Sequence, residues 1–350
     1  MHLVAAAAGE KVAFVWTEEG CVEDDPYRSY VRLFDSVHPE GLVIRDNQDL
    51  PHFGARVDLR VREAGSQVAV SWASDTLEEG GTWLVDGATG TVTTRFQGEG
   101  YVLGFPPEFS DDLVLLGAPG EGQGGSIYVF DAEATGFLSE VDAIAEHHAR
   151  PGDSGFGKYM VSLGDVDGDG LSDVIVEAGT SSLLVSGPDL LEYNGVYSGM
   201  PFGTELMFTE KTATGLPDFD GDGLRDFAVG HRPSSRAPLG NITFHTALQA
   251  DAVATLYDDR DGNHEIGAEF GALGDVNGNG LPEMVVTELD PFDPSHLFVV
   301  EAPFCGVMML EEVGTPLELP ETCCSGTSAV EGALVLAAYE PVAESYTYRL

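Results

Sequence analysis

The chain has 350 residues, which exceeds the usual size of a single hydrophobic core, so it needs several domains or a repeating architecture. Its 43% hydrophobic content is that of a folded protein, and its apolar runs fall short of the ~18 residues that span a bilayer. The formal net charge of −43, with only 16 lysine and arginine residues, excludes nucleic acid and anionic membranes as partners, because like charges repel.

A short apolar run, often β-branched, recurs along the chain and predicts a strand at each occurrence. The runs are Val12–Trp16, Val68–Trp72, Leu113–Gly117, Val174–Glu177, Phe227–Gly230, Met284–Thr287 and Leu334–Ala338. Successive runs start at residues 12, 68, 113, 174, 227, 284 and 334. This recurrence indicates an internal repeat of about 50 residues.

A second predicted strand, alternating or aromatic in character, follows each apolar run. These strands are Tyr30–Asp35, Thr82–Asp86, Ser126–Asp131, Ser182–Ser186, Asn241–His245, His296–Glu301 and Ser345–Arg349. A Phe-Gly pair precedes the apolar run in several units, at residues 53–54, 156–157, 202–203 and 270–271. Late in the units a fourth β-branched run is found, such as Thr91–Phe96 or Ala252–Tyr257.

Four short strands per unit are typical of propeller blades, because one four-stranded sheet cannot bury its face alone. We therefore expect an all-β fold, a β-propeller of seven blades of mostly four short antiparallel strands, as a single domain over residues 1–350. The predicted units are approximately 1–50, 51–99, 100–152, 153–200, 201–267, 268–314 and 315–350. A β-solenoid and separate sandwich domains are the alternatives. The last unit ends after its third strand, so either this blade has three strands or, as we favour, the chain is excised from a longer protein.

An acidic, glycine-rich loop directly precedes the apolar run in three successive units. It has oxygen-bearing side chains at positions 1, 3, 5 and 9, glycine at positions 4 and 6, and at position 7 a carbonyl that can point inward. The candidate metal ligands are Asp165, Asp167, Asp169, Leu171 and Asp173, then Asp218, Asp220, Asp222, Leu224 and Asp226, and then Asp275, Asn277, Asn279, Leu281 and Glu283.

This loop pattern predicts calcium at about three sites, because Ca²⁺ takes ~6–8 hard oxygen ligands and glycine permits the tight curl that gathers them. Acidic hairpin turns that bind no metal are the alternative, which the threefold recurrence disfavours. The loop of the sixth unit carries two carboxylates and is expected to bind more weakly. Three Ca²⁺ ions would offset six of the negative charges, so most of the acidity is interpreted as a solvated surface.

The Phe-Gly pair, the DxDGDGxxD loop, the apolar strand and a Gly-Ala-Pro sequence at residues 117–119 together resemble the FG-GAP repeats of integrin α-subunit-like propellers. The resemblance covers nearly the whole chain and is most specific in units four to six. It implies a seven-bladed propeller with calcium on the loops of one face, used for adhesion and recognition outside the cell. It implies metal only at the three loops, because residues 58–65 and 106–112 lack the spacing.

Sequence motifs for a catalytic nucleophile with its base, for a metalloprotease or for a phosphate-binding loop are not found in the chain. We therefore expect a non-enzymatic, calcium-binding module for recognition or adhesion, extracellular or on the cell surface, with a protein or glycan ligand and without membrane insertion. The alternative is the propeller domain of a secreted hydrolase or lyase that acts on polysaccharide or lipid.

The four cysteines, Cys21, Cys305, Cys323 and Cys324, are an even number and permit two disulfides. One hypothesis pairs Cys21 with Cys323 or Cys324, which joins the first unit to the last, and pairs Cys305 with the other of the two. Free thiols are the alternative. The adjacent His147 and His148 are expected to lie in a solvated linker.

Overall fold

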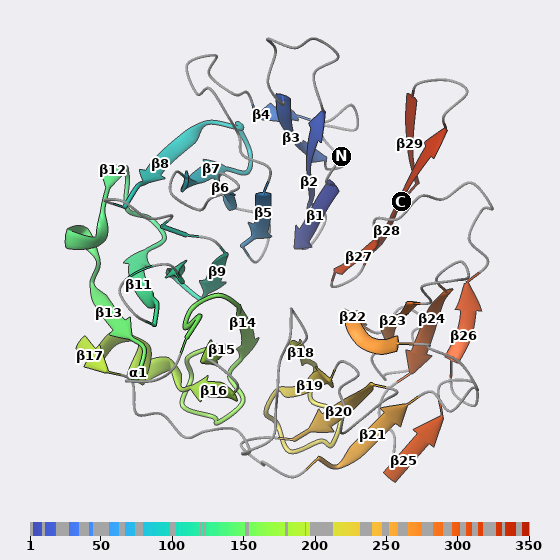
Figure 1. Cartoon of the computed structure of the whole chain (residues 1–350). Helices are drawn as coiled ribbons and strands as arrows, with labels where there is room; N and C mark the ends of the chain where they lie inside the picture. The colour runs from blue at the N-terminus through green and yellow to red at the C-terminus, as the bar shows by residue number, and fades with distance from the viewer. Residues whose placement is uncertain are drawn as a thin grey trace. The chain divides into compact units, whose positions relative to one another are not determined.

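The structure is a computed structural model in which the described residues form mostly short strands and turns (Figure 1). The helices among them are short, α1 (Gly187–Glu192) and the 3-10 helix η2 (Glu140–Asp142). Among the described residues, no helix has the length and apolar character needed to cross a membrane. The structure describes residues 3–8, 11–18, 28–34, 42–44, 56–62, 67–73, 80–98, 103–104, 106–119, 121, 124–150, 154–178, 181–192, 194–196, 213–231, 240–246, 252–257, 265–274, 283–289, 296–301, 306–309, 314–317, 327–330, 333–340 and 345–349.

The described strands group into seven sheets, and the first three come from the N-terminal part of the chain (Figure 1). The first has the order β1-β2-β3-β4, with β1 (Leu3–Ala8), β2 (Lys11–Glu18), β3 (Arg28–Phe34) and β4 (Leu42–Ile44). The second has the order β12-β8-β7-β6-β5, with β5 (Arg56–Val61), β6 (Gln67–Ala73), β7 (Gly80–Asp86), β8 (Val92–Phe96) and β12 (Gly136–Leu138). The third has the order β17-β13-β11-β10-β9, with β9 (Pro107–Ser110), β10 (Leu113–Ala118), β11 (Ser126–Asp131), β13 (Ala145–His148) and β17 (Asn194–Val196).

The other four sheets follow in chain order. The fourth is β14-β15-β16, with β14 (Met160–Gly164), β15 (Asp173–Ala178) and β16 (Ser181–Val185). The fifth is β18-β19-β20-β21-β25, with β18 (Ala213–Leu216), β19 (Asp226–His231), β20 (Asn241–His245), β21 (Ala254–Tyr257) and β25 (Gly306–Met309). The sixth is β22-β23-β24-β26, with β22 (Glu265–Gly274), β23 (Glu283–Leu289), β24 (His296–Glu301) and β26 (Gly314–Leu317). The seventh is β27-β28-β29, with β27 (Thr327–Val330), β28 (Ala333–Glu340) and β29 (Ser345–Arg349).

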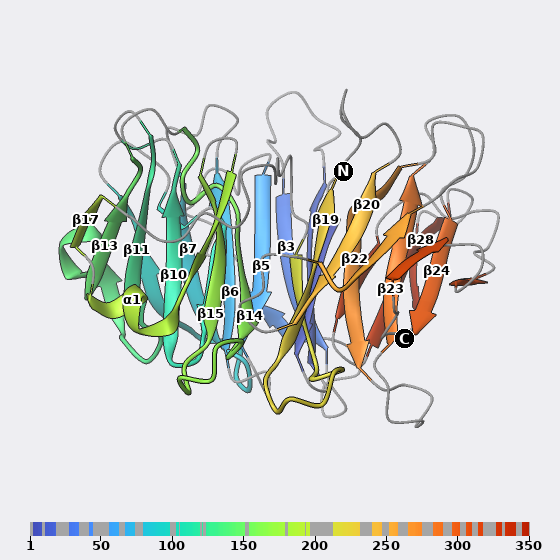
Figure 2. The same cartoon turned by 90° about the horizontal axis from the view of Figure 1, so that it is seen from below.

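The two strand predictions are confirmed in every unit. Each recurring apolar run lies in the second strand of a sheet, from β2 to β28. Each following run coincides with the third strand, from β3 to β29, except that Ser186 comes just after β16 and Asp35 lies outside the described residues. Figure 2 shows β10, β11 and β13 side by side in the third sheet, where β10 pairs antiparallel with β11. The sixth sheet runs from Glu265 to Leu317, so it extends past the predicted unit limits of 268 and 314.

The Phe-Gly pair at residues 156–157 shows why this dipeptide suits its position. Phe156 is buried, and Gly157 has a φ of 75°, a left-handed conformation that favours glycine. A Cβ at Gly157 would lie 2.6 Å from the carbonyl oxygen of Ser126. The pairs at residues 53–54 and 202–203 lie outside the described residues, and the pair at 270–271 lies within β22.

Three sheets contain a further strand that the sequence did not predict. β12 pairs in parallel with β8, β17 with β13, and β25 with β21. In each case the added strand follows the third strand of the next sheet along the chain and joins the last strand of the sheet before it. These strands have three or four residues, too few for an alternating pattern to be recognised.

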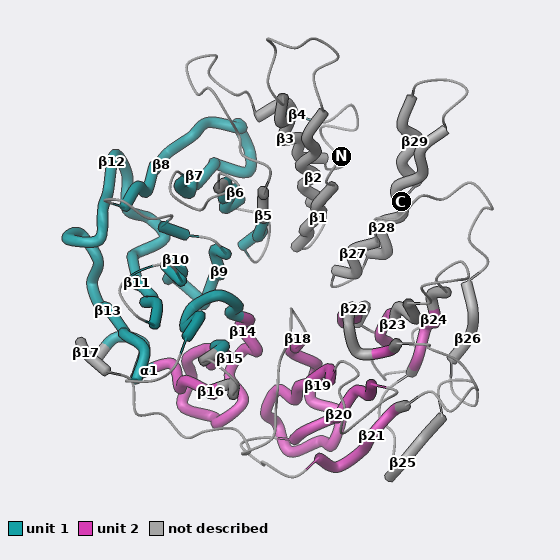
Figure 3. The backbone as a smooth tube through the Cα atoms, in the orientation of Figure 1, with its two compact units in different colours: residues 1–160, 176–179, 188–199 teal, residues 161–175, 180–187, 200–350 magenta. Residues whose placement is uncertain are grey.

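The chain divides into two compact units, residues 1–160, 176–179 and 188–199, and residues 161–175, 180–187 and 200–350 (Figure 3). The first unit has a core that includes Leu84, Phe96 and Phe130, and the rings of the two phenylalanines lie 4.8 Å apart. Each fully buried side chain of this size contributes roughly 1.5–3 kcal/mol by leaving water. Two core clusters occupy the second unit, one around Leu163 and Phe227 and one around Phe244 and Met284.

Candidate metal centres

Two of the three predicted metal loops lie among the described residues, and each one connects the first strand of a sheet to the second. Loop 1, residues 165–173, leads from β14 into β15, and loop 2, residues 218–226, leads from β18 into β19. Of the third loop, residues 275–282 lie outside the described residues, while Glu283 begins β23 and is buried.

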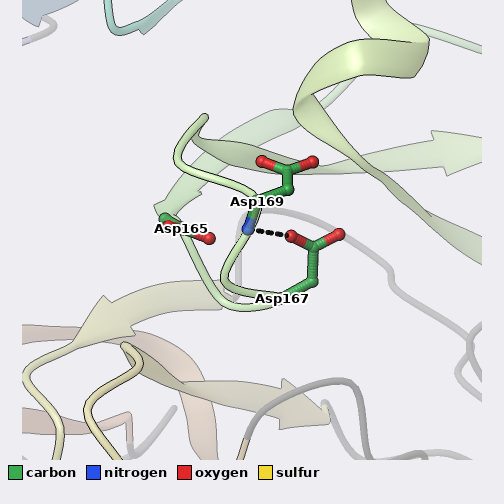
Figure 4. Close-up of side chains that lie close together, drawn as sticks. All are labelled: Asp165, Asp167 and Asp169. Atoms are coloured by element: carbon green, nitrogen blue, oxygen red, sulfur yellow. Dashed lines mark hydrogen bonds between the residues drawn. The ribbon is translucent and has the colours of Figure 1, made fainter.

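Loop 1 curls around its own first carboxylate. The backbone N–H of Gly168 donates to Asp165 Oδ1 at 2.6 Å, and that of Gly170 donates to Asp165 Oδ2 at 3.0 Å. The N–H of Asp169 donates to Asp167 Oδ1 at 3.0 Å (Figure 4). Gly168 and Gly170 have φ values of 83° and 91°, so glycine supplies the left-handed turns that the sequence pattern predicted.

Loop 2 has the same internal geometry. The N–H groups of Gly221 and Gly223 donate to Asp218 Oδ1 and Oδ2 at 2.6 and 2.8 Å. The N–H of Asp222 donates to Asp220 Oδ1 at 3.0 Å. The φ values of the two glycines are 83° and 92°, nearly those of loop 1. Because these contacts lie within six residues, the local sequence is sufficient to produce the curl.

Three carboxylates converge in each loop. One oxygen from each of Asp165, Asp167 and Asp169 lies within 4.8 Å of the other two, and Asp218, Asp220 and Asp222 form an equivalent group. The curl of each loop thus brings together the side chains of positions 1, 3 and 5. The position-7 residues, Leu171 and Leu224, donate their N–H groups to the position-5 carboxylate at 2.8 Å in both loops.

The ninth residue of each loop lies outside its group of three. Asp173 is fully buried, and its Oδ2 and Oδ1 accept from the N–H groups of Val166 at 2.9 Å and Gly187 at 3.1 Å. Asp226 is also fully buried, and its Oδ2 accepts from the N–H of Phe219 at 2.7 Å. Asp226 Oδ1 is buried and has no hydrogen bond of normal geometry within the described part of the chain. In this arrangement the ninth carboxylate anchors the base of the loop.

Burial raises the pKa of both Asp173 and Asp226 to about 6, because water no longer stabilises the ionised form. Backbone N–H donors act in the opposite direction, from Val166 and Gly187 on Asp173 and from Phe219 and Asp220 on Asp226. The nearby carboxylates of positions 3 and 5 raise each pKa further. A cation in the loop would lower the pKa of these carboxyl groups again, because a positive charge favours their ionised form.

A hydroxyl group that sequence reasoning missed lies against loop 1. Ser186, the first residue after β16, has its Oγ 3.2 Å from Asp167 Oδ2 and 3.1 Å from Asp169 Oδ2. Ser186 follows the loop by thirteen residues, so only the sheet topology brings it there. Thr246 is the first residue after β20 and holds the corresponding place for loop 2, but no hydrogen bond joins it to the described loop 2 carboxylates.

Loops 1 and 2 also contact each other. The N–H of Arg225 donates to the carbonyl oxygen of Asp165 at 3.2 Å, and the Arg225 side chain covers Gly164, where a Cβ would lie 2.3 Å from its Cδ. A Cβ at Gly168 would lie 3.0 Å from Leu224 Cδ2. The two candidate centres are therefore neighbours within one compact unit.

The prediction for the adjacent histidines is wrong, since His147 and His148 belong to β13 instead of a solvated linker. In β13, which pairs with β11, buried residues alternate with partly exposed ones, and His147 is 2% exposed. His147 Nε2 lies 3.1 Å from the carbonyl oxygen of Leu190, and burial lowers the pKa of this imidazole. Cys21, Cys305, Cys323 and Cys324 lie outside the described residues, so their pairing stays a prediction.

No protein-family model and no curated protein matches the sequence. Among solved structures, the chain is similar to the propeller of Dos1, with a TM-score of 0.55 and 12% identity, over 96% of this chain and 78% of that one. It is also similar to a chain from a study of two prolyl endopeptidases, with a TM-score of 0.51 and 12% identity, over 98% of this chain and 45% of that one. At this identity the likeness shows the fold alone, and the blade number and the FG-GAP resemblance stay predictions. The chain has the β-propeller fold.

Proposed function

We propose that this β-propeller binds calcium, with one Ca²⁺ in each of loops 1 and 2 and, on the sequence pattern, a third at residues 275–283. The observation that carries the proposal is the convergence of three carboxylates in both described loops, with one oxygen of each within 4.8 Å of the others. Three like charges at this separation repel one another, and a cation between them turns that repulsion into attraction.

The donor set favours calcium over other metals. All the side chains in both groups are carboxylates, hard oxygen donors, whereas zinc and copper prefer nitrogen and sulfur. Two oxygens on opposite sides of one Ca²⁺ lie about 4.6–5.2 Å apart, since each Ca²⁺–oxygen distance is ~2.3–2.6 Å. The separations in both loops are compatible with one such sphere. Because much of each group is exposed, water would complete a coordination number of ~6–8.

A melting experiment tests the calcium proposal. We expect the melting temperature to be several degrees higher in millimolar Ca²⁺ than in excess chelator, because an ion that binds only the folded chain stabilises it by mass action. Combining Asp167→Asn with Asp220→Asn should remove most of this calcium-dependent shift. The matched control is Asp189→Asn, which removes an exposed carboxylate from α1 outside both loops. Identical melting with calcium and with chelator would refute the proposal.

For the biological role, we propose an extracellular or cell-surface recognition or adhesion module whose ligand is a protein or a glycan. Its support is the sequence resemblance to FG-GAP repeats and the position of the loops at strand ends, where a rigid sheet presents them. The net charge of −43 favours a ligand that presents a cationic surface.

A second candidate role is the propeller part of a secreted hydrolase or lyase. The fold similarity to a prolyl endopeptidase chain, of which this chain spans less than half, is the observation that favours it. Incubating the purified chain with panels of polysaccharides, lipids and peptides separates the two roles. Saturable binding without product supports the recognition module, whereas product formation at a rate proportional to protein concentration supports the enzyme.

A further inference from the structure

We infer that the segment of residues 136–144, which runs from β12 towards β13, docks a partner protein whose contact surface combines apolar side chains with lysine or arginine (Figure 1). This inference rests on the recognition role proposed above, gives that role a surface and a class of partner, and is independent of calcium. It is carried by three exposed apolar side chains, which we call the apolar patch, and by the carboxylates around them. The patch consists of Phe137, Val141 and Ile144.

The exposure of the apolar patch sets it apart from the rest of the described surface. Phe137, Val141 and Ile144 are 75%, 84% and 49% exposed, and the next most exposed large apolar side chain among the described residues is 42% exposed. Phe137 and Ile144 are seven residues apart, so at most about 25 Å of chain separates them, and one partner surface can contact all three. Single exposed apolar residues are normal, whereas a group of them marks an interaction site.

The segment is fixed to the core of the first compact unit between and beside the exposed positions. Leu138 and Ala143 pack against the core cluster that includes Phe130. The carbonyl oxygen of Leu138 accepts from the N–H of Gln97 at 3.1 Å, and the N–H of Ile144 donates to the carbonyl oxygen of Val129 at 2.8 Å. Because this backbone is already ordered, a partner that docks on it pays little conformational entropy.

Phe137 is also positioned by a cation. In the parallel pairing of β12 with β8, Phe137 lies opposite Arg95. The Arg95 guanidinium lies 5.4 Å from the centroid of the Phe137 ring and 5.5 Å from that of the Trp83 ring. Trp83 is buried, whereas three quarters of the Phe137 surface stays open to solvent. Arg95 therefore attracts one part of the Phe137 ring and leaves the rest available to a partner.

The surroundings of the apolar patch select the charge of the partner. Residues 131–146 contain five carboxylates among 16 residues and no lysine or arginine, whereas the whole chain has 59 acidic residues among 350. Arg62 pairs with one of the five, but the segment itself supplies no cation. All five are exposed or half-buried, namely Asp131, Glu133, Glu140, Asp142 and Glu146. A partner with lysine or arginine around its apolar residues is complementary to this surface.

The same charges disfavour two other occupants of an apolar patch. A second copy of the chain would bring five further carboxylates against these five, and each copy carries a net charge of −43. An anionic membrane surface would be repelled in the same way. A cationic partner protein therefore fits the apolar patch best.

A double-mutant cycle between the whole chain and a probe peptide tests this docking site. The probe is a synthetic peptide of lysine and leucine with the leucines on one helical face, and a matched peptide of equal charge has serine in place of each leucine. The leucine peptide should bind the unaltered chain at least about tenfold more tightly than the serine peptide. Combining Phe137→Ser with Val141→Ser should remove this preference, because the apolar contact is lost from both sides of the cycle.

The matched control combines Leu191→Ser with Val253→Ser, which removes two exposed apolar side chains outside the patch, and it should retain the preference. Fluorescence anisotropy of the labelled peptides at low salt measures the affinities, and circular dichroism checks that each variant is folded. Added NaCl should weaken the binding of both peptides, because their shared attraction to the chain is electrostatic.

The outcomes separate the docking site from the role on which it rests. A preference for leucine that survives in the patch variant, or no such preference in the unaltered chain, overturns the docking site, while binding of the lysine peptides leaves the proposed cationic ligand in place. If neither peptide binds at low salt, the docking site and that ligand fail together. Self-association of the chain, or binding to phosphatidylcholine vesicles, that the patch variant abolishes would make the occupant a second copy or a lipid surface and would overturn the partner protein.

Discussion

His231, at the end of β19, is the titratable residue outside the loops whose pKa changes most within the described part of the chain. Its Nε2 lies 3.0 Å from Thr243 Oγ1, and His245 Nε2 lies 2.9 Å from the same oxygen. Since the Thr243 hydroxyl donates to the carbonyl oxygen of Val229 at 3.3 Å, both imidazoles donate to it through Nε2–H. Burial lowers the pKa of His231 to about 4.

This burial predicts a loss of stability in acid. Between about pH 6.5 and pH 4 the unfolded chain binds a proton at residue 231 that the folded chain does not, so the free energy of unfolding should decrease as the pH falls. The contribution is about 3 kcal/mol over this range. Replacing His231→Gln should remove that part of the pH dependence, as measured by urea denaturation between pH 7 and pH 4.

Comparison with the unaltered chain is essential for this measurement, because protonation of the many carboxylates reduces repulsion and changes stability in the opposite direction. Parallel pH profiles for the two proteins would contradict the assignment to His231.

At the scale of elements, Arg62 ties the second sheet to the third. It follows β5, its side chain is 12% exposed, and its guanidinium donates to the carbonyl oxygen of Asp111 at 3.1 Å and to Gln67 Oε1 at 3.0 Å. It also forms ion pairs with Asp112 and Glu133. Five donors fixed in one plane make these contacts at once, which a lysine ammonium cannot reproduce.

We therefore expect Arg62→Lys to lower the free energy of unfolding by about 1 kcal/mol, because a partly buried hydrogen bond to Gln67 and an exposed one to the carbonyl oxygen of Asp111 are lost. Urea denaturation at neutral pH measures the change. The controls are Asp112→Asn and Glu133→Gln, whose side chains are 90% and 71% exposed, and each should cost less than about 0.5 kcal/mol. Equal losses in all three variants would mean that the ion pairs with Asp112 and Glu133, and not the hydrogen bonds to Gln67 and Asp111, hold the sheets together.

At the scale of the whole molecule, the net charge of −43 is far larger than the calcium loops account for. Ions in the three loops would neutralise six charges, so the folded chain carries strong repulsion between its carboxylates with or without calcium. Folding concentrates these charges, and repulsion of this kind destabilises a compact state.

The charge predicts stabilisation by simple salt. In excess chelator, raising NaCl from ~0.01 M to ~1 M shortens the screening length from about 30 Å to about 3 Å, and the melting temperature should rise. Chloride is the appropriate anion, because sulfate also strengthens hydrophobic burial. A melting temperature that stays constant or falls across this series would show that the acidic surface does not limit stability.

The sequence by itself determined the strands and the curl of the acidic loops. Both depend on residues that are near one another along the chain. The runs that form β10 and β19 have the composition of buried strands. In loop 1, the hydrogen bonds that Asp165 accepts come from residues no farther along the chain than Gly170. The propeller fold followed from the recurrence of such units, because each sheet needs neighbours to bury its faces. The blade number and the metal itself remain predictions from the same pattern.

Only the tertiary structure decided what surrounds each loop. Ser186 and Gly187 form hydrogen bonds with the carboxylates of loop 1 because β16 ends beside this loop. Thr246 is the corresponding residue after β20, but among the described residues it forms no hydrogen bond with the carboxylates of loop 2. The burial of His147 and the parallel strands β12, β17 and β25 were equally invisible in the sequence. These features arise from contacts between segments distant along the chain, which a local pattern does not encode.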